Sequence, residues 1–238
     1  MGAAMYRAVT SLILFLLLSF SAYAGDKSPW VSCLNSDIFI VSDFSDSMSG
    51  YESLMTDAFQ SIADGVLKEN RRTRMGLVTF QFLATVEQKL THDYSEFVEK
   101  IQDLRNRCAG NGTDIVHGLE EAALEYSKSP LSPTAELPDY KKIIILITDG
   151  EDSPKDAIVE YANKLKAQGW WIYSVMVYKK SNLTIPSTPT TIGMTQYTTT
   201  EEMMLKLVSG SPHSNKEYFS SVALENLPEY FSKFFSCF

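Results

Sequence analysis

The 238-residue chain contains little cysteine and little histidine, with three residues of each. So few cysteines exclude a disulfide-rich scaffold. The scattered His92, His117 and His213 provide no paired imidazoles for a zinc or copper site. Basic residues are also scarce, because 21 Lys and Arg stand against 29 Asp and Glu, for a formal net charge of −8. Nucleic-acid binding needs clustered positive charge, so we expect no nucleic-acid partner.

Only one basic cluster is present, Arg71-Arg72-Thr73-Arg74, and it lies directly before an expected strand. A short run of like charges usually belongs to a solvated surface rather than to a binding site. We therefore interpret this cluster as the solvated end of a helix.

Long apolar runs are absent after the first 24 residues. Before that point, Arg7 precedes the apolar run Ser11–Phe20, and Ala22-Tyr23-Ala24 has the small-residue spacing of a cleavage site. The run is short for a membrane span, which takes about 20 residues. We predict a signal peptide over residues 1–24 and one mature domain over 25–238, secreted outside the cell, or into the periplasm of a bacterium, with no membrane span. A retained signal anchor is the alternative.

An exported chain meets oxidising conditions, so a disulfide is expected. Cys33 precedes the first expected strand and Cys237 is the penultimate residue. Since domain termini often lie close together, we predict a Cys33–Cys237 bridge. Cys108 then remains as an inert thiol or as the site of an intermolecular bridge. Asn182, in the sequon Asn182-Leu183-Thr184, is a candidate glycosylation site in a eukaryotic host.

Short apolar runs alternate with amphipathic segments along the chain, which is typical of α/β proteins. Runs without polar alternation favour parallel strands that are covered on both faces. We expect a three-layer, Rossmann-like, open and mostly parallel sheet with helices on both faces. The expected strands are Ile38–Val41, Met75–Phe80, a short edge strand Ala84–Glu87, Ile143–Ile147, Trp170–Val177 and one near Tyr218-Phe219; the expected helices lie within Leu54–Leu67, Phe97–Leu104, Ile115–Tyr126, Ser153–Gly169, Glu201–Val208 and Leu224–Phe235.

Two aspartates directly follow expected strands, Asp43 after Ser42 and Asp149 after Thr148. Ligands of open α/β sheets bind beyond the carboxyl ends of the strands, so both carboxylates should lie at one edge of the sheet. In an extended loop alternate side chains point the same way, which brings Asp43, Ser45 and Ser47 together. Carboxylate and hydroxyl oxygens favour a hard cation, Mg²⁺ or otherwise Mn²⁺ or Ca²⁺.

These residues resemble a known site. Asp43-x-Ser45-x-Ser47, Thr113 in Gly112-Thr113-Asp114, and Asp149 in Thr148-Asp149-Gly150 are similar to the metal-ion-dependent adhesion site of von Willebrand factor type A domains, as in integrin I domains. The resemblance extends over about residues 36 to 236. It implies that Ser45, Ser47 and Thr113 contact the metal directly, and that Asp43 and Asp149 bind it directly or through water.

Three further acidic residues surround this motif. Asp46 stands between the serines, where the family often has glycine, and Glu151 and Asp152 follow Asp149. They are candidate residues of the ligand-binding rim. Such acids would raise the affinity for the cation, hold a second cation, or repel an acidic partner.

The resemblance implies a protein-binding module for adhesion or assembly, without catalysis, whose partner offers an acidic side chain to the metal. Two alternatives remain. One is a metal-dependent hydrolase or phosphatase, although Ser45 replaces the second aspartate of a D-x-D loop and G-x-S-x-G is absent. The other is a structural protein whose metal site is vestigial.

Overall fold

The computed structural model describes residues 35–68, 72–107, 109–132, 135–137, 139–150, 154–179, 200–212 and 218–234. The predicted signal peptide lies outside these residues, as do Cys33, Cys108, Cys237 and Asn182. The cleavage, disulfide and glycosylation predictions therefore stay predictions. Within the described part of the chain, no helix is both long and apolar enough to cross a bilayer.

Six strands form a single sheet in the order β3-β2-β1-β4-β5-β6. All neighbouring strands are parallel except β3, which pairs antiparallel with β2. Their bounds are β1 Ser36–Asp43, β2 Arg74–Phe80, β3 Ala84–Thr91, β4 Lys141–Thr148, β5 Trp170–Tyr178 and β6 Phe219–Ala223. This confirms the predicted open, mostly parallel sheet.

The edge strand β3 is longer than the predicted Ala84–Glu87, because it continues to Thr91. Its second half carries polar side chains that the pattern of apolar residues does not reveal. Gln88 and Thr91 are buried, and their side chains donate to the Glu96 carboxylate at 3.0 and 2.6 Å. Buried polar residues that are hydrogen-bonded to Glu96 thus extend the strand.

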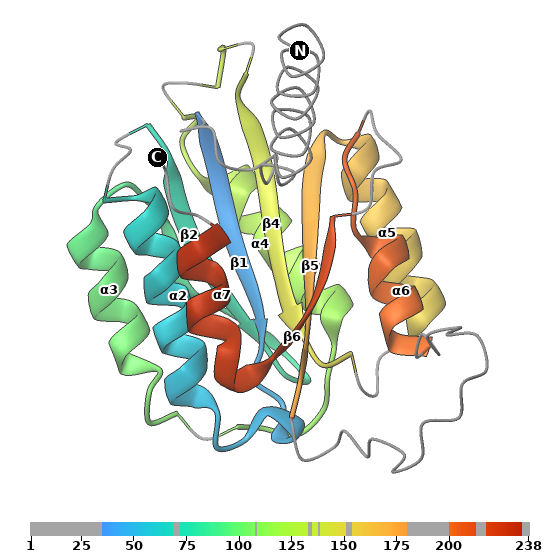
Figure 1. The fold of residues 1–238 in the computed structure, drawn as a ribbon. Coiled ribbons are helices and arrows are strands. Elements are labelled where there is room, and N and C mark those ends of the chain that lie inside the picture. Colours follow the sequence, from blue (N-terminus) through green and yellow to red (C-terminus); the bar gives the residue numbers. More distant parts are fainter. Residues whose placement is uncertain are drawn as a thin grey trace, which may run out of the picture. The chain divides into compact units, whose positions relative to one another are not determined.

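Helices cover both faces of the sheet, as predicted (Figure 1). The helices α2, α3 and α7 pack together on one face, and α4, α5 and α6 pack together on the other. Their bounds are α2 Glu52–Val66, α3 Tyr94–Asp103, α4 Ile115–Lys128, α5 Lys155–Ala167, α6 Thr200–Val208 and α7 Leu227–Phe234, with 3-10 helices at Asp46–Met48 (η2) and Leu224–Asn226 (η4). The last predicted helix therefore begins as a 3-10 turn.

Local signals set the starts and ends of several helices. Asp114 caps α4 by accepting from the His117 amide at 3.0 Å. Pro154 directly precedes α5, whereas Ser153, the first residue of the predicted helix, lies outside the described residues. Gly169 follows the end of α5 with a φ of 91°, a left-handed conformation that glycine adopts at little cost.

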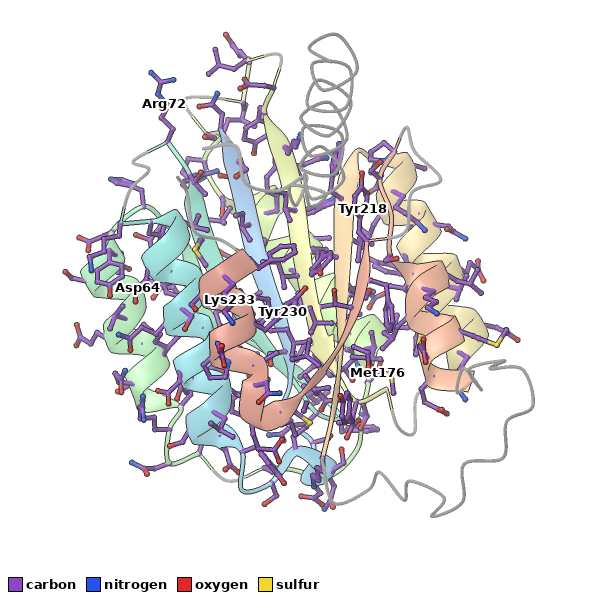
Figure 2. All side chains as sticks on the ribbon, viewed as in Figure 1. Asp64, Arg72, Met176, Tyr218, Tyr230 and Lys233 are labelled. Carbon is purple, nitrogen blue, oxygen red and sulfur yellow. The ribbon has the colours of Figure 1, made fainter. Side chains whose placement is uncertain are left out.

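The interpretation of the basic cluster is wrong for Arg74. This residue begins β2, directly opposite Asp37 of β1 in the parallel register. Its Nε and Nη2 donate to the two Asp37 carboxylate oxygens at 2.8 and 2.6 Å, and the Asp37 side chain is fully buried. The position of Arg72 agrees with the interpretation, because its side chain is exposed and projects away from the sheet (Figure 2). Arg71 lies outside the described residues.

Candidate metal centre

The predicted site residues follow strands that lie side by side at the centre of the sheet. Ser42 of β1 is paired with Ile147 of β4, so the two strands end at the same level. Thr148 is in turn paired with Met176 of β5, which Figure 2 labels near this lower edge. Because parallel strands share the direction of their carboxyl ends, the loops after β1 and β4 emerge together.

Asp43 is the last residue of β1 and its side chain is fully buried. Its Oδ1 accepts from the Ser45 amide at 2.9 Å, and its Oδ2 accepts from the Thr148 hydroxyl at 2.6 Å. Burial nevertheless raises the pKa of the Asp43 carboxyl to about 6, and the negative charge of Asp149 adds to the rise. The folded chain thus holds a carboxyl group here whose negative charge, when it ionises, is not compensated by its surroundings.

The loop after Asp43 brings two hydroxyls together. Ser45 Oγ lies 2.9 Å from Ser47 Oγ, although Ser47 belongs to the 3-10 helix η2 and not to an extended loop. At the end of η2, the Met48 amide donates to the Ser45 carbonyl at 2.9 Å, and the Met48 side chain is buried. Asp46, which lies between the two serines, is exposed, as expected for a rim residue.

The segment that carries Thr113 is joined to the serine loop through its backbone. Ser45 forms a parallel bridge with Gly110, and the Gly110 amide donates to the Phe44 carbonyl at 3.1 Å. On the other side of Thr113, the Asp114 amide donates to the Gln81 carbonyl at 2.7 Å. Thr113 lies between these attachments and is half-buried.

The loop after β4 is attached through Thr148, whose hydroxyl donates to Asp43 and accepts from the Gly150 amide at 2.9 Å. Asp149 lies between these two residues and is half-buried. Gly150 has a φ of 79°, and a β-carbon there would lie 3.1 Å from Cβ of Glu201 on α6. Glu201 in turn accepts from Lys155 of α5 at 2.8 Å.

Sequence reasoning missed the roles of Thr148 and Glu201. The tripeptide Thr148-Asp149-Gly150 contained a signal for the first, since a hydroxyl at a strand end can reach a neighbouring strand. Nothing in the sequence links Glu201 to a loop some fifty residues earlier. Glu151 and Asp152, the other predicted rim residues, lie outside the described residues.

The oxygen atoms at this edge fit a hard cation. Among the described residues, no group of three or more His, Cys, Asp and Glu side chains could hold a metal. A site of serine and threonine hydroxyls with two carboxylates is of another kind, and suits Mg²⁺, Mn²⁺ or Ca²⁺. In the part of the chain that the structure describes, no ion pair joins Asp43 to a lysine, arginine or histidine.

Comparisons with known proteins agree with this architecture. The profile of the von Willebrand factor type A domain matches residues 37–232. An uncharacterized protein of Borreliella burgdorferi is 27% identical over 146 residues, which are 58% of this chain and 40% of that protein. The chain thus matches less than half the length of this relative.

Two solved structures have a similar fold. Proximal thread matrix protein 1 from the mussel byssus superposes with a TM-score of 0.61 and 20% identity, over 86% of this chain and 46% of that one. The vWF domain of the type V pili tip protein Mfa5 from Porphyromonas gingivalis has a TM-score of 0.61 and 14% identity, over 85% and 94%. At these identities the likeness concerns the fold.

Proposed function

Because this chain belongs to the von Willebrand factor type A domain family, we propose that it is a non-enzymatic module that binds a protein partner through a divalent cation. The cation would be held by Asp43, Ser45, Ser47, Thr113 and Asp149. The observation that carries this proposal is the pair of hydroxyls of Ser45 and Ser47, 2.9 Å apart beside a buried carboxylate.

The charges at this edge support a cation that remains available to a partner. Burial of Asp43 disfavours its ionised form, and a nearby positive charge would reverse that preference. Hydroxyl ligands are neutral, so a bound Mg²⁺, Mn²⁺ or Ca²⁺ would retain enough positive charge to attract a carboxylate of the partner into its coordination shell. Asp46 is exposed and stands between the two serines in the loop. Its negative charge would therefore restrict which acidic partners can bind at the cation.

The surroundings of Asp43 argue against a phosphatase. A nucleophilic carboxylate must present an oxygen to the substrate. Both oxygens of Asp43 accept hydrogen bonds, one from the Ser45 amide and one from the Thr148 hydroxyl, and the side chain has no exposed surface. Asp43 is therefore suited to position the loop hydroxyls and the cation rather than to attack a substrate.

We further infer that the module acts outside the cytoplasm. The apolar run before Ala22-Tyr23-Ala24 supports export, and a pilus tip protein and a byssal thread protein share the fold. N-terminal sequencing of the protein recovered from its native medium should read Gly25 as the first residue. An intact Met1 on recovered protein would contradict cleavage and favour a retained anchor.

Two measurements test the cation and the partner. Calorimetry on chelator-treated protein should record saturable uptake of Mg²⁺, Mn²⁺ or Ca²⁺, and a pull-down from native extracellular material should capture proteins that elute with chelator. The double variant Asp43→Ala, Asp149→Ala should lose both the heat of binding and the captured proteins, because it lacks both carboxylates of the site.

The matched control is Asp156→Ala, which removes an exposed carboxylate from α5 and should behave like the unmodified chain. Capture that persists in chelator and in the double variant would contradict the proposal and favour a vestigial site. Phosphatase or esterase turnover that disappears with Asp43→Ala would support the enzyme instead.

A further inference from the structure

Two large apolar side chains are exposed next to the candidate metal centre. Phe82 and Leu83 lie in the turn between β2 and β3, and 70% and 66% of their surfaces are accessible. The Phe82 amide donates to the Asn111 carbonyl at 3.1 Å, which holds this turn against the segment that carries Thr113. A partner bound at the cation would therefore meet an apolar surface beside it.

Behind this turn, a cavity of about 540 Å³ is lined by residues of β3, α4 and α5. We call it the hairpin pocket. Leu83 and Leu124 give it apolar walls, and Leu124 is itself 47% exposed. His117, Glu120, Glu121 and Tyr161 add polar groups. No lysine or arginine is found among the described residues that line the pocket.

The carboxylates of Glu120 and Glu121 make the hairpin pocket acidic, and the His117 ring, which also lines it, has its Nδ1 3.2 Å from Asp114 Oδ2. Within the described ranges, neither Glu120 nor Glu121 takes part in an ion pair. Burial, followed by the negative charge of Glu120, raises the pKa of Tyr161. Lys164 lies 5.5 Å from the centre of the Tyr161 ring, but it does not line the pocket.

We infer that Phe82, Leu83 and the hairpin pocket form a docking surface for a segment of the partner protein in which a long basic side chain follows an apolar one. The apolar residue packs on Phe82 and Leu83. The methylene groups of the arginine or lysine lie along Leu83 and Leu124, and its charged end reaches the carboxylates of Glu120 and Glu121. This inference rests on the proposed function only in placing the partner at this edge of the molecule.

A random peptide library displayed on phage, selected on the purified chain in Mg²⁺, tests the docking surface. We expect the enriched peptides to contain an apolar residue followed by arginine or lysine. Their affinity should fall at least about tenfold in the double variant Glu120→Lys, Glu121→Lys and in Phe82→Ser, since a few central contacts carry most of the binding free energy. Glu99→Lys on the opposite face and Leu131→Ser, whose side chain is 79% exposed, are the matched controls and should bind unchanged.

The outcomes separate this inference from the proposed function. Peptides that are sensitive to the Glu120 and Phe82 variants but not to chelator would support the docking surface and contradict the role of the cation. Peptides that are sensitive to chelator alone would overturn the docking surface and leave the cation in place. A selection without any peptide that depends on Glu120, Glu121 or Phe82 would also overturn it. Each variant should keep the melting temperature that the unmodified chain has in chelator, which excludes misfolding as the cause of a loss.

Discussion

Asp37→Ala is expected to lower the free energy of unfolding by about 3–5 kcal/mol, because it leaves the mostly buried Arg74 guanidinium without its carboxylate partner. The Asp37 side chain has no exposed surface and that of Arg74 is 13% exposed. Asp37 also accepts from the Tyr140 hydroxyl at 2.6 Å, so the variant breaks a third hydrogen bond. Urea unfolding monitored by circular dichroism measures the loss.

The control for this prediction is the ion pair between Asp57 and Arg105, whose side chains are 42% and 33% exposed. Solvent screens such pairs, so Asp57→Ala should cost less than about 1 kcal/mol. The double variant Asp37→Leu, Arg74→Met should recover part of the loss, since it removes both buried charges together. Equal effects of Asp37→Ala and Asp57→Ala would refute the importance of the buried pair.

In chelator at pH 7, Asp43→Asn is expected to raise the free energy of unfolding by about 2 kcal/mol. A carboxyl whose pKa is raised from 3.8 to about 6 carries about 3 kcal/mol of unfavourable free energy when it ionises in the folded chain. The amide avoids that cost, but it accepts with one oxygen only and loses one of two hydrogen bonds, worth about 1 kcal/mol. With saturating Mg²⁺ the order should reverse, because the cation stabilises only the chain that binds it.

The pH dependence of this difference has a defined sign. Since the folded pKa of Asp43 is the higher one, the metal-free folded chain binds this proton more tightly than the unfolded chain, and stability is lost as the pH rises from about 4 to about 6. The advantage of Asp43→Asn should therefore be small at pH 4 and nearly complete at pH 7. Asp46→Asn, in the same loop but exposed, should show no such change in chelator.

If Asp43→Asn were less stable than the unmodified chain in chelator at pH 7, burial of the charge would not be the dominant effect at this position. If Mg²⁺ stabilised both chains equally, Asp43 would not contribute to the cation site. Thermal unfolding with and without chelator, at both pH values, distinguishes the two results.

The class of fold and the proximity of Ser45 and Ser47 could be predicted from the amino-acid sequence. Unbroken apolar runs such as Ile143–Ile147 favour burial on both faces, as in a parallel sheet between helices. Ser45 and Ser47 do lie together, but Ser47 belongs to η2 rather than to an extended loop, so their proximity arises from a different local geometry.

Which distant side chains meet depends on the assembled fold. Arg74 belongs to a basic run and was predicted to be solvated. The register of β1 and β2 instead places it opposite Asp37, 37 residues away. The bond from Thr148 to Asp43 spans 105 residues, and the hairpin pocket joins β3 to two helices. Hydrophobic periodicity predicts which face of an element is buried, whereas strand register and helix packing determine the partners of a buried polar group, and those depend on the whole assembled core.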